Sequence, residues 1–254
     1  MRLTKEDFKI LDKFNFELAP VGIKYLFKKP PKDIPKYEGK VNICEAPAAA
    51  AKGKAFYNSL SEFSCVAPII LGMIDKDTVY EAGLMGQKYE IFDEPRDNKK
   101  LYQYAPRFPN GSIRYVLFAP LDKMTFNPDI LFVHANGQQA RILMRASGYS
   151  NTKIWHATAA AALTCSFMFV HCVQQSEINF AVTPVGMGGK VYPDGTWLIS
   201  FPYEVLPALI WSLENMNWTP GWDKMTPKEL QKHIDHINKE VEEETGVKVD
   251  IKGE

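Results

Sequence analysis

The alternation of apolar and polar positions divides the chain into strands and helices that follow one another along most of its length. Short apolar runs rich in β-branched and aromatic residues predict strands at 20–27, 41–43, 112–121 and 129–135, and a strand, glycine loop and strand over 178–202. Helical spacing of apolar residues, or a proline that opens a run, predicts helices at 4–16, 47–56, 68–73, 96–104, 137–148, 156–172, 203–216 and 226–245.

Strands and helices that alternate in this way are typical of an α/β (or α+β) fold. We therefore expect a single domain over residues 1–254, with a mixed β-sheet flanked by helices. The stretch 28–40 is rich in proline and lysine and has no apolar period, so we expect a surface loop there. The helix at 226–245 is mostly charged and begins with a capping box formed by Thr226 and Glu229.

Composition and charge narrow the classes of function. The 254 residues carry 30 basic and 30 acidic side chains, so no overall field favours nucleic acid, and we expect no nucleic-acid partner. The apolar runs are too short to span a membrane, and the charged start "MRLTKEDFKILDKF" is not typical of a signal peptide. We expect a cytoplasmic protein with no membrane partner; a homo-oligomer stays open.

Two of the four cysteines stand three residues before a proline, in "CEAP" (44–47) and "CVAP" (65–68). If these prolines open helices, Cys44 and Cys65 lie within a turn of two helix N-termini, where the macrodipole lowers the pKa of a thiol. Thiolates bind metals and attack electrophiles. The alternative is that both are small apolar residues filling space between a helix and a strand.

The other two cysteines, Cys165 and Cys172, fall on one predicted helix. Seven helical residues turn the chain through about 700° and advance it by roughly 10 Å. Both side chains then face the same side, but they lie too far apart to ligate one metal ion. At most one of them joins Cys44 and Cys65.

A histidine and a glycine loop complete the candidate chemistry. His134 ends a predicted buried strand, at the edge where ligands gather in open α/β sheets, so His134 or His156 is a candidate general base. The loop matches neither a Walker A nor a dinucleotide pattern, yet its backbone N–H groups could hold a small anion or cofactor. The alternative, which the pattern favours, is that the loop is a flexible hairpin connection. Its candidate binding residues are Gly186, Met187, Gly188, Gly189 and Lys190.

Taken together, these features resemble domain-of-unknown-function family 169, a group of archaeal and bacterial proteins. The resemblance spans roughly residues 18–215 and rests on order and spacing. Its matching features are "PVGIKYLF", Cys44 followed by Gly53 and Phe56, Cys65 with "ILG" at 70–72, "VLFAPLDKMTFNPDILFVHANGQQARIL", a helix carrying Cys165, a glycine turn and "ISFPYEVLPALI".

The resemblance implies candidate positions rather than a function. The family's pattern often has a further cysteine directly after a glycine in the late turn, where this chain has Met187 after Gly186. Three or four cysteines that converge would suit an iron–sulfur cluster or a soft metal. On this chain the ligands would be Cys44, Cys65 and Cys165.

Three functions stay open at this point. The first is a cofactor- or metal-binding protein, related to redox chemistry or to an iron–sulfur cluster. The second is an enzyme in which Cys44 or Cys65 is the nucleophile and His134 or His156 the base, acting on a small organic or acyl substrate. The third is a metal-free module that binds a small-molecule ligand or another protein.

Overall fold

The computed structural model describes residues 3–75, 82–150, 153–157, 162–182 and 191–248. The chain divides into two compact units, Met1–Glu214 and Asn215–Glu254. Within the described ranges, no helix has both the length and the apolar character needed to cross a membrane.

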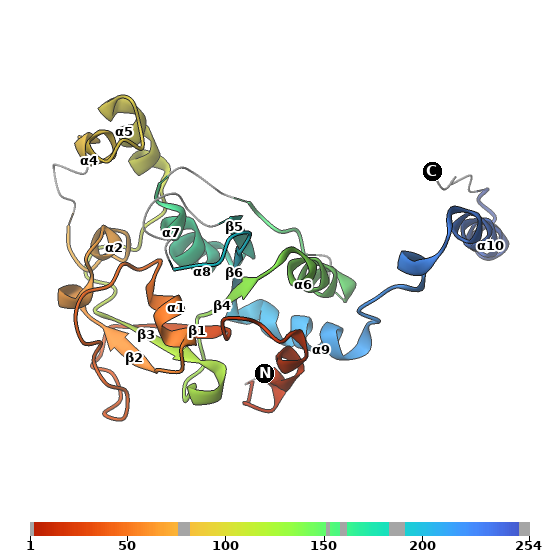
Figure 1. Cartoon of the computed structure of the whole chain (residues 1–254), viewed down its shortest axis with the longest axis horizontal. Coiled ribbons are helices and arrows are strands. Elements are labelled where there is room, and N and C mark those ends of the chain that lie inside the picture. Colours follow the sequence, from red (N-terminus) through yellow and green to blue (C-terminus); the bar gives the residue numbers. More distant parts are fainter. Residues whose placement is uncertain (1–2, 76–81, 151–152, 158–161, 183–190, 249–254) are drawn as a thin grey trace. The chain divides into compact units, whose positions relative to one another are not determined.

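The first unit is built on a six-stranded sheet in the order β2-β3-β1-β4-β6-β5 (Figure 1). The strands are β1 (Val21–Leu26), β2 (Phe56–Asn58), β3 (Tyr115–Pro120), β4 (Ile130–Ala135), β5 (Asn179–Val182) and β6 (Trp197–Pro202). Helices accompany this sheet throughout, as the predicted α/β class requires.

All strand pairs of the sheet are antiparallel, whereas the alternation of elements predicted a mixed sheet. Parallel pairing in the described part of the chain is limited to three isolated bridges, Lys36–Tyr57, Val41–Phe63 and His156–Asn179. The reason for the difference is that an apolar run reports burial on both faces of a strand and not its direction.

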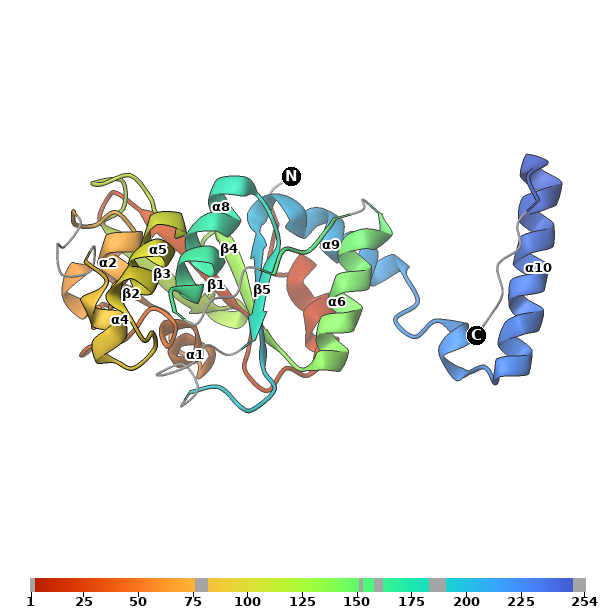
Figure 2. The same cartoon turned by 90° about the horizontal axis from the view of Figure 1, so that it is seen from above.

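Helices cover both faces of the sheet (Figures 1 and 2). The face of the cysteines carries α1 (Ala46–Ala51), α2 (Ala67–Ile70), α7 (Thr164–Ser166), the π-helical turn η4 (Phe167–His171) and α8 (Cys172–Gln175). The opposite face carries the 3₁₀-helix η1 (Asp7–Phe14), α6 (Gly137–Tyr149) and α9 (Leu206–Asn215). Among the described residues, the further helices of this unit are α4 (Leu84–Lys88), α5 (Pro95–Tyr104), η2 (Leu60–Glu62), η3 (Leu121–Lys123) and η6 (Tyr203–Val205).

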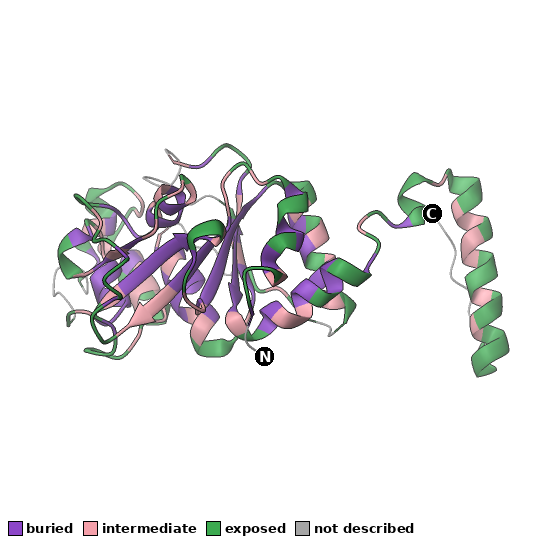
Figure 3. Cartoon of the chain, turned by 90° about the horizontal axis from the view of Figure 1, so that it is seen from below, coloured by how far each residue is buried: buried purple, intermediate pink, exposed green. Residues whose placement is uncertain are grey.

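The core lies between the sheet and these helical layers, and the central strands are buried along most of their length (Figure 3). Successive side chains of a strand point to opposite faces of the sheet. On the face of α1 and η4, Ile23, Phe118 and Phe132 pack with Ala48 and Phe169 in one hydrophobic cluster. This face positions the candidate site.

Two predicted helices are shorter than expected. The helix opened by Pro47 ends at Ala51, because Gly53 adopts a φ of 93° and β2 begins at Phe56. The helix expected over 156–172 begins at Thr164, because Leu163 has a φ of 58° and His156 pairs with Asn179. The short strand expected at 41–43 is reduced to the single bridge of Val41.

The second unit contains η7 (Gly221–Lys224) and α10 (Pro227–Thr245). The predicted capping box is present: the Thr226 backbone N–H donates to the Glu229 carboxylate at 2.8 Å, and the Glu229 N–H donates to the Thr226 hydroxyl at 3.4 Å. The helix ends at Gly246, which has a φ of 71°.

Candidate functional site

Cys44 and Cys65 lie on two segments that run side by side on the helical face of the sheet. The Val41 N–H donates to the Glu62 carbonyl at 2.9 Å, and the Ser64 N–H donates to the Val41 carbonyl at 3.1 Å. The Ile43 N–H then donates to the sulfur of Cys65 at 3.3 Å. Each segment continues into a short helix, α1 after Cys44 and α2 after Cys65, so the two cysteines are held as neighbours.

Cys165 joins them from a distant part of the sequence. It lies in α7, which packs against α2. Burial raises the pKa of the Cys165 thiol well above its usual value, and the charges of Cys65 and Cys44 raise it further. The contact between α7 and α2 places Cys165 in a helix next to the one that follows Cys65.

Cys172 takes no part in this group. It is fully buried and donates a weak hydrogen bond to the Ser200 carbonyl, at 3.5 Å from sulfur to oxygen. Apart from burial, the charge that raises the pKa of its thiol is that of Glu204. All four cysteines are free thiols. Of the two cysteines in the 164–175 helical segment, Cys165 is therefore the one on which the charges of Cys44 and Cys65 act.

The expectation that helix N-termini lower the pKa of Cys44 and Cys65 is wrong. Burial, then the charges of Cys65 and Glu45, raise the pKa of Cys44 to about 12. Burial also raises the pKa of Cys65, although its sulfur accepts hydrogen bonds from the Ile43 and Ala67 N–H groups. Both helices are too short to build a strong dipole, so desolvation outweighs the backbone donors.

His134 lies on β4, as predicted, and its side chain is buried against two aromatic rings. The imidazole centroid is 5.3 Å from that of Phe132 and 5.1 Å from that of Tyr192. Neither ring nitrogen of His134 has a hydrogen-bond partner, and burial lowers its pKa to about 3. The imidazole is therefore neutral at physiological pH and a weak proton acceptor.

Tyr192 connects His134 to the cysteine segment, because its hydroxyl donates a hydrogen bond to the Cys44 carbonyl. Sequence reasoning missed this residue. It follows the glycine loop without any motif of its own, and only the fold brings it to Cys44. The loop residues Gly186, Met187, Gly188, Gly189 and Lys190 lie outside the described residues.

His156 forms an isolated bridge with Asn179, the first residue of β5. Its Nε2 is 3.7 Å from a Glu177 carboxylate oxygen, and the Nε2 of His171 is 3.1 Å from the same oxygen. Both imidazoles therefore share one carboxylate, and His156 is engaged there rather than beside a cysteine.

The donor set of three thiols fits a soft metal or an iron–sulfur cluster by its chemistry. Among the described residues, however, no three His, Cys, Asp or Glu side chains are grouped closely enough to hold a metal ion as they stand. Any such group would be bound by Cys44, Cys65 and Cys165, because the charges of the first two act on the thiol of the third.

Comparison with known proteins identifies a family for this chain. The model of the family DUF169, described as "Uncharacterised ArCR", matches residues 9–211. No curated protein and no solved structure matches the chain. The match covers well over half of the sequence and includes the cysteine site and the whole sheet. The chain belongs to domain-of-unknown-function family 169.

Proposed function

We propose that the protein binds an iron–sulfur cluster or a soft metal through Cys44, Cys65 and Cys165, and that it serves in cytoplasmic redox chemistry or cofactor handling. One observation supports the proposal: the free thiols of Cys44 and Cys65 act electrostatically on the free thiol of Cys165, and the helix of Cys165 packs against the helix that follows Cys65.

A cluster and a single ion make different demands on the spacing of the thiols. A thiolate binds a metal such as zinc at about 2.3 Å, so two thiolates on one ion are at most about 4.6 Å apart. A cluster of several irons takes cysteine ligands that lie farther apart. Metal and sulfide analysis distinguishes the two, because only a cluster contains sulfide.

Because the pKa values of the thiols are raised, binding of a metal or cluster should depend on pH. Cys44 and Cys65 are protonated at neutral pH in the free protein, and each must lose its proton to become a ligand. Binding therefore releases protons and strengthens as the pH rises. Three protein thiolates leave one coordination position for a further residue or an exogenous ligand.

A thiol nucleophile has less support. Such an enzyme needs a thiolate at neutral pH, but burial and the charges of Cys65 and Glu45 raise the pKa of Cys44 to about 12. Its candidate base His134 has a pKa lowered to about 3, so the imidazole would take up a thiol proton poorly.

The test is anaerobic purification of the full chain followed by metal and sulfide analysis and a visible absorption spectrum. We expect near-stoichiometric iron and a coloured protein. Cys44→Ser, Cys65→Ser and Cys165→Ser should each lower the bound metal at least about tenfold. Cys172→Ser is the control, because Cys172 is also a free cysteine of the same helical layer but is not one of the proposed ligands, and this variant should keep its metal. A colourless, metal-free anaerobic protein would refute the proposal.

A further inference from the structure

A groove of about 610 Å³ lies next to the edge strand β2, and no cysteine is among the residues that line it. Leu60, Met73 and Ile113 give it an apolar lining, and the serine hydroxyls of η2 and its cap add polar groups. Ligand sites usually measure about 300–1,000 Å³ and combine an apolar wall with a few polar groups. The size and the lining of this groove are those of a small-molecule site.

Two cations, Lys40 and Arg114, line the same groove, and both are exposed. The Arg114 guanidinium lies 4.4 Å from the centre of the Phe27 ring, which leaves its charge uncompensated. Within the residues that the structure describes, neither Lys40 nor Arg114 forms an ion pair. The groove therefore offers two positive charges without a protein anion to neutralise them.

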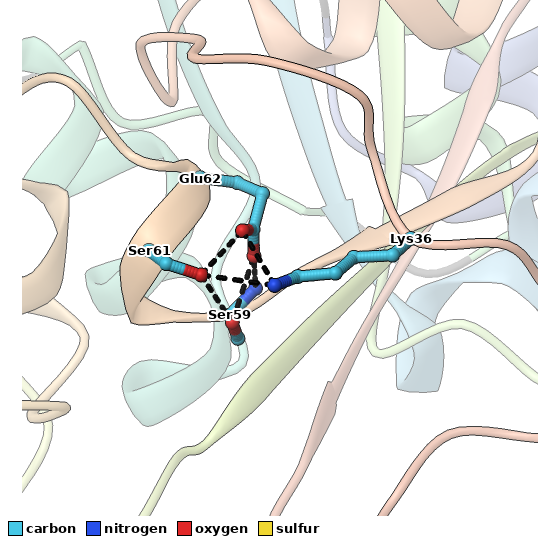
Figure 4. Close-up of polar contacts among 4 residues, drawn as sticks. All are labelled: Lys36, Ser59, Ser61 and Glu62. Carbon is cyan, nitrogen blue, oxygen red and sulfur yellow. Dashed lines mark hydrogen bonds and ion pairs between the residues drawn. The ribbon is translucent and has the colours of Figure 1, made fainter.

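The nearby carboxylate of Glu62 does not neutralise Lys40 or Arg114, because it already interacts with Lys36, Ser59 and Ser61 (Figure 4). Lys36 approaches it at 2.8 Å, and the hydroxyls of Ser59 and Ser61 donate to it. Burial alone would raise the pKa of Glu62, but the hydrogen bonds from Lys36, Ser61 and Ser59 outweigh it and lower the pKa to about 2. Glu62 thus balances Lys36, and the charge of Lys40 and Arg114 stays in excess.

We propose that this groove binds a small organic carboxylate with an apolar body. The carboxylate pairs with Lys40 and Arg114, and the apolar body covers Leu60, Met73 and Ile113. Both parts are required, because exposed cations alone attract any anion weakly and an apolar wall alone does not distinguish charge. The site is separate from the thiol group and does not depend on the metal proposal.

The test is isothermal titration of the full chain with octanoate, 1-octanol and acetate at low ionic strength. Octanoate carries both the charge and the apolar body, whereas 1-octanol lacks the charge and acetate lacks the body. We expect octanoate to bind at least about tenfold more tightly than either, and its affinity to fall as salt is added.

Variants then locate the site. Lys40→Gln combined with Arg114→Gln should weaken octanoate binding by about tenfold or more, because the paired charges are lost. Lys13→Gln combined with Lys99→Gln is the matched control, since it removes two exposed cations elsewhere and should leave the affinity unchanged. Circular dichroism checks that both variants are folded.

Several results would overturn the proposal. These are no octanoate binding up to millimolar concentrations, equal affinity for 1-octanol, or equal losses in the two double variants. Because neither pair of variants touches a cysteine, these results are independent of whether the anaerobic protein carries metal.

Discussion

His134 is a buried imidazole on the core face of β4, and both of its ring nitrogens lack a hydrogen-bond partner. An unsatisfied buried polar group costs about 1–3 kcal/mol. The sequence placed His134 correctly at the end of a buried strand. It did not show that Phe132 and Tyr192 enclose the ring, because Tyr192 reaches it only through the fold.

Replacing His134 with leucine should raise the free energy of unfolding at neutral pH by about 1–3 kcal/mol, because it removes the unsatisfied nitrogens and keeps a similar volume. The pH dependence should change too. Burial lowers the folded-state pKa of His134 to about 3, so between pH 6.5 and 3 the unfolded chain takes up a proton that the folded chain does not.

Stability of the natural chain should therefore fall as the pH drops through this window, by about 2 kcal/mol from pH 7 to pH 5 from this residue alone. The variant should lack that contribution. Urea denaturation of both proteins at the two pH values measures it. If both proteins lose the same stability between pH 7 and pH 5, then His134 does not stay neutral in the folded protein.

At the scale of elements, Gly72 ends the short helix that follows Cys65. It adopts a φ of 65°, and a Cβ at this position would lie 2.8 Å from the Phe108 carbonyl oxygen and collide with that of Pro109. The chain on either side is fixed, since the Phe108 N–H donates to Ile70 and the Gly111 N–H donates to Gly72, at 2.9 and 2.7 Å. The close approach and the backbone conformation both require glycine.

Gly72→Ala should destabilise the protein by about 2–4 kcal/mol, because it adds steric conflict to an unfavourable φ. Gly137→Ala is the control: Gly137 begins α6, and a Cβ there meets nothing within 4 Å. Alanine at this position should change stability by less than about 1 kcal/mol, in the stabilising direction. Chemical denaturation measures the free energy of unfolding of both variants. Equal stability changes in Gly72→Ala and Gly137→Ala would contradict the steric conflict at Gly72.

Most elements could be predicted from local pattern, and the exceptions have a common cause. The helix at 137–148 and the strand at 129–135 are found as α6 and β4, because their apolar periods agree with their burial. The segment around His156 is rich in alanine and reads as helix, yet His156 pairs with Asn179. There a tertiary contact overrides local propensity.

At the scale of the molecule, the sheet, the core and the thiol group all belong to the unit Met1–Glu214, which also contains the family match over 9–211. In the second unit, no residue of α10 is buried. A chain that ends at residue 216 should therefore fold by itself. We expect its Tm to lie within about 4 °C of that of the full chain, because little apolar burial is lost.

Calorimetry of the two chains, together with their anaerobic absorption spectra, tests this expectation. The spectrum should be the same in both. A shortened chain that is insoluble, or that unfolds at a much lower temperature, would mean that the first unit depends on residues beyond 216.

The sequence by itself determined the α/β class, the main strands and helices, the family and the cysteines that are candidate ligands. Local propensity and apolar period suffice for these, because they act over a few neighbouring residues. Only the tertiary structure decided that the strands are antiparallel, that the helix of Cys165 packs against the helix after Cys65, and that Tyr192 contacts Cys44.

The same is true of the thiol pKa values. Position before a helix predicted a lowered pKa, but burial by segments distant in the sequence raised it. Desolvation depends on everything that surrounds a group, and that surrounding is assembled only when the chain has folded.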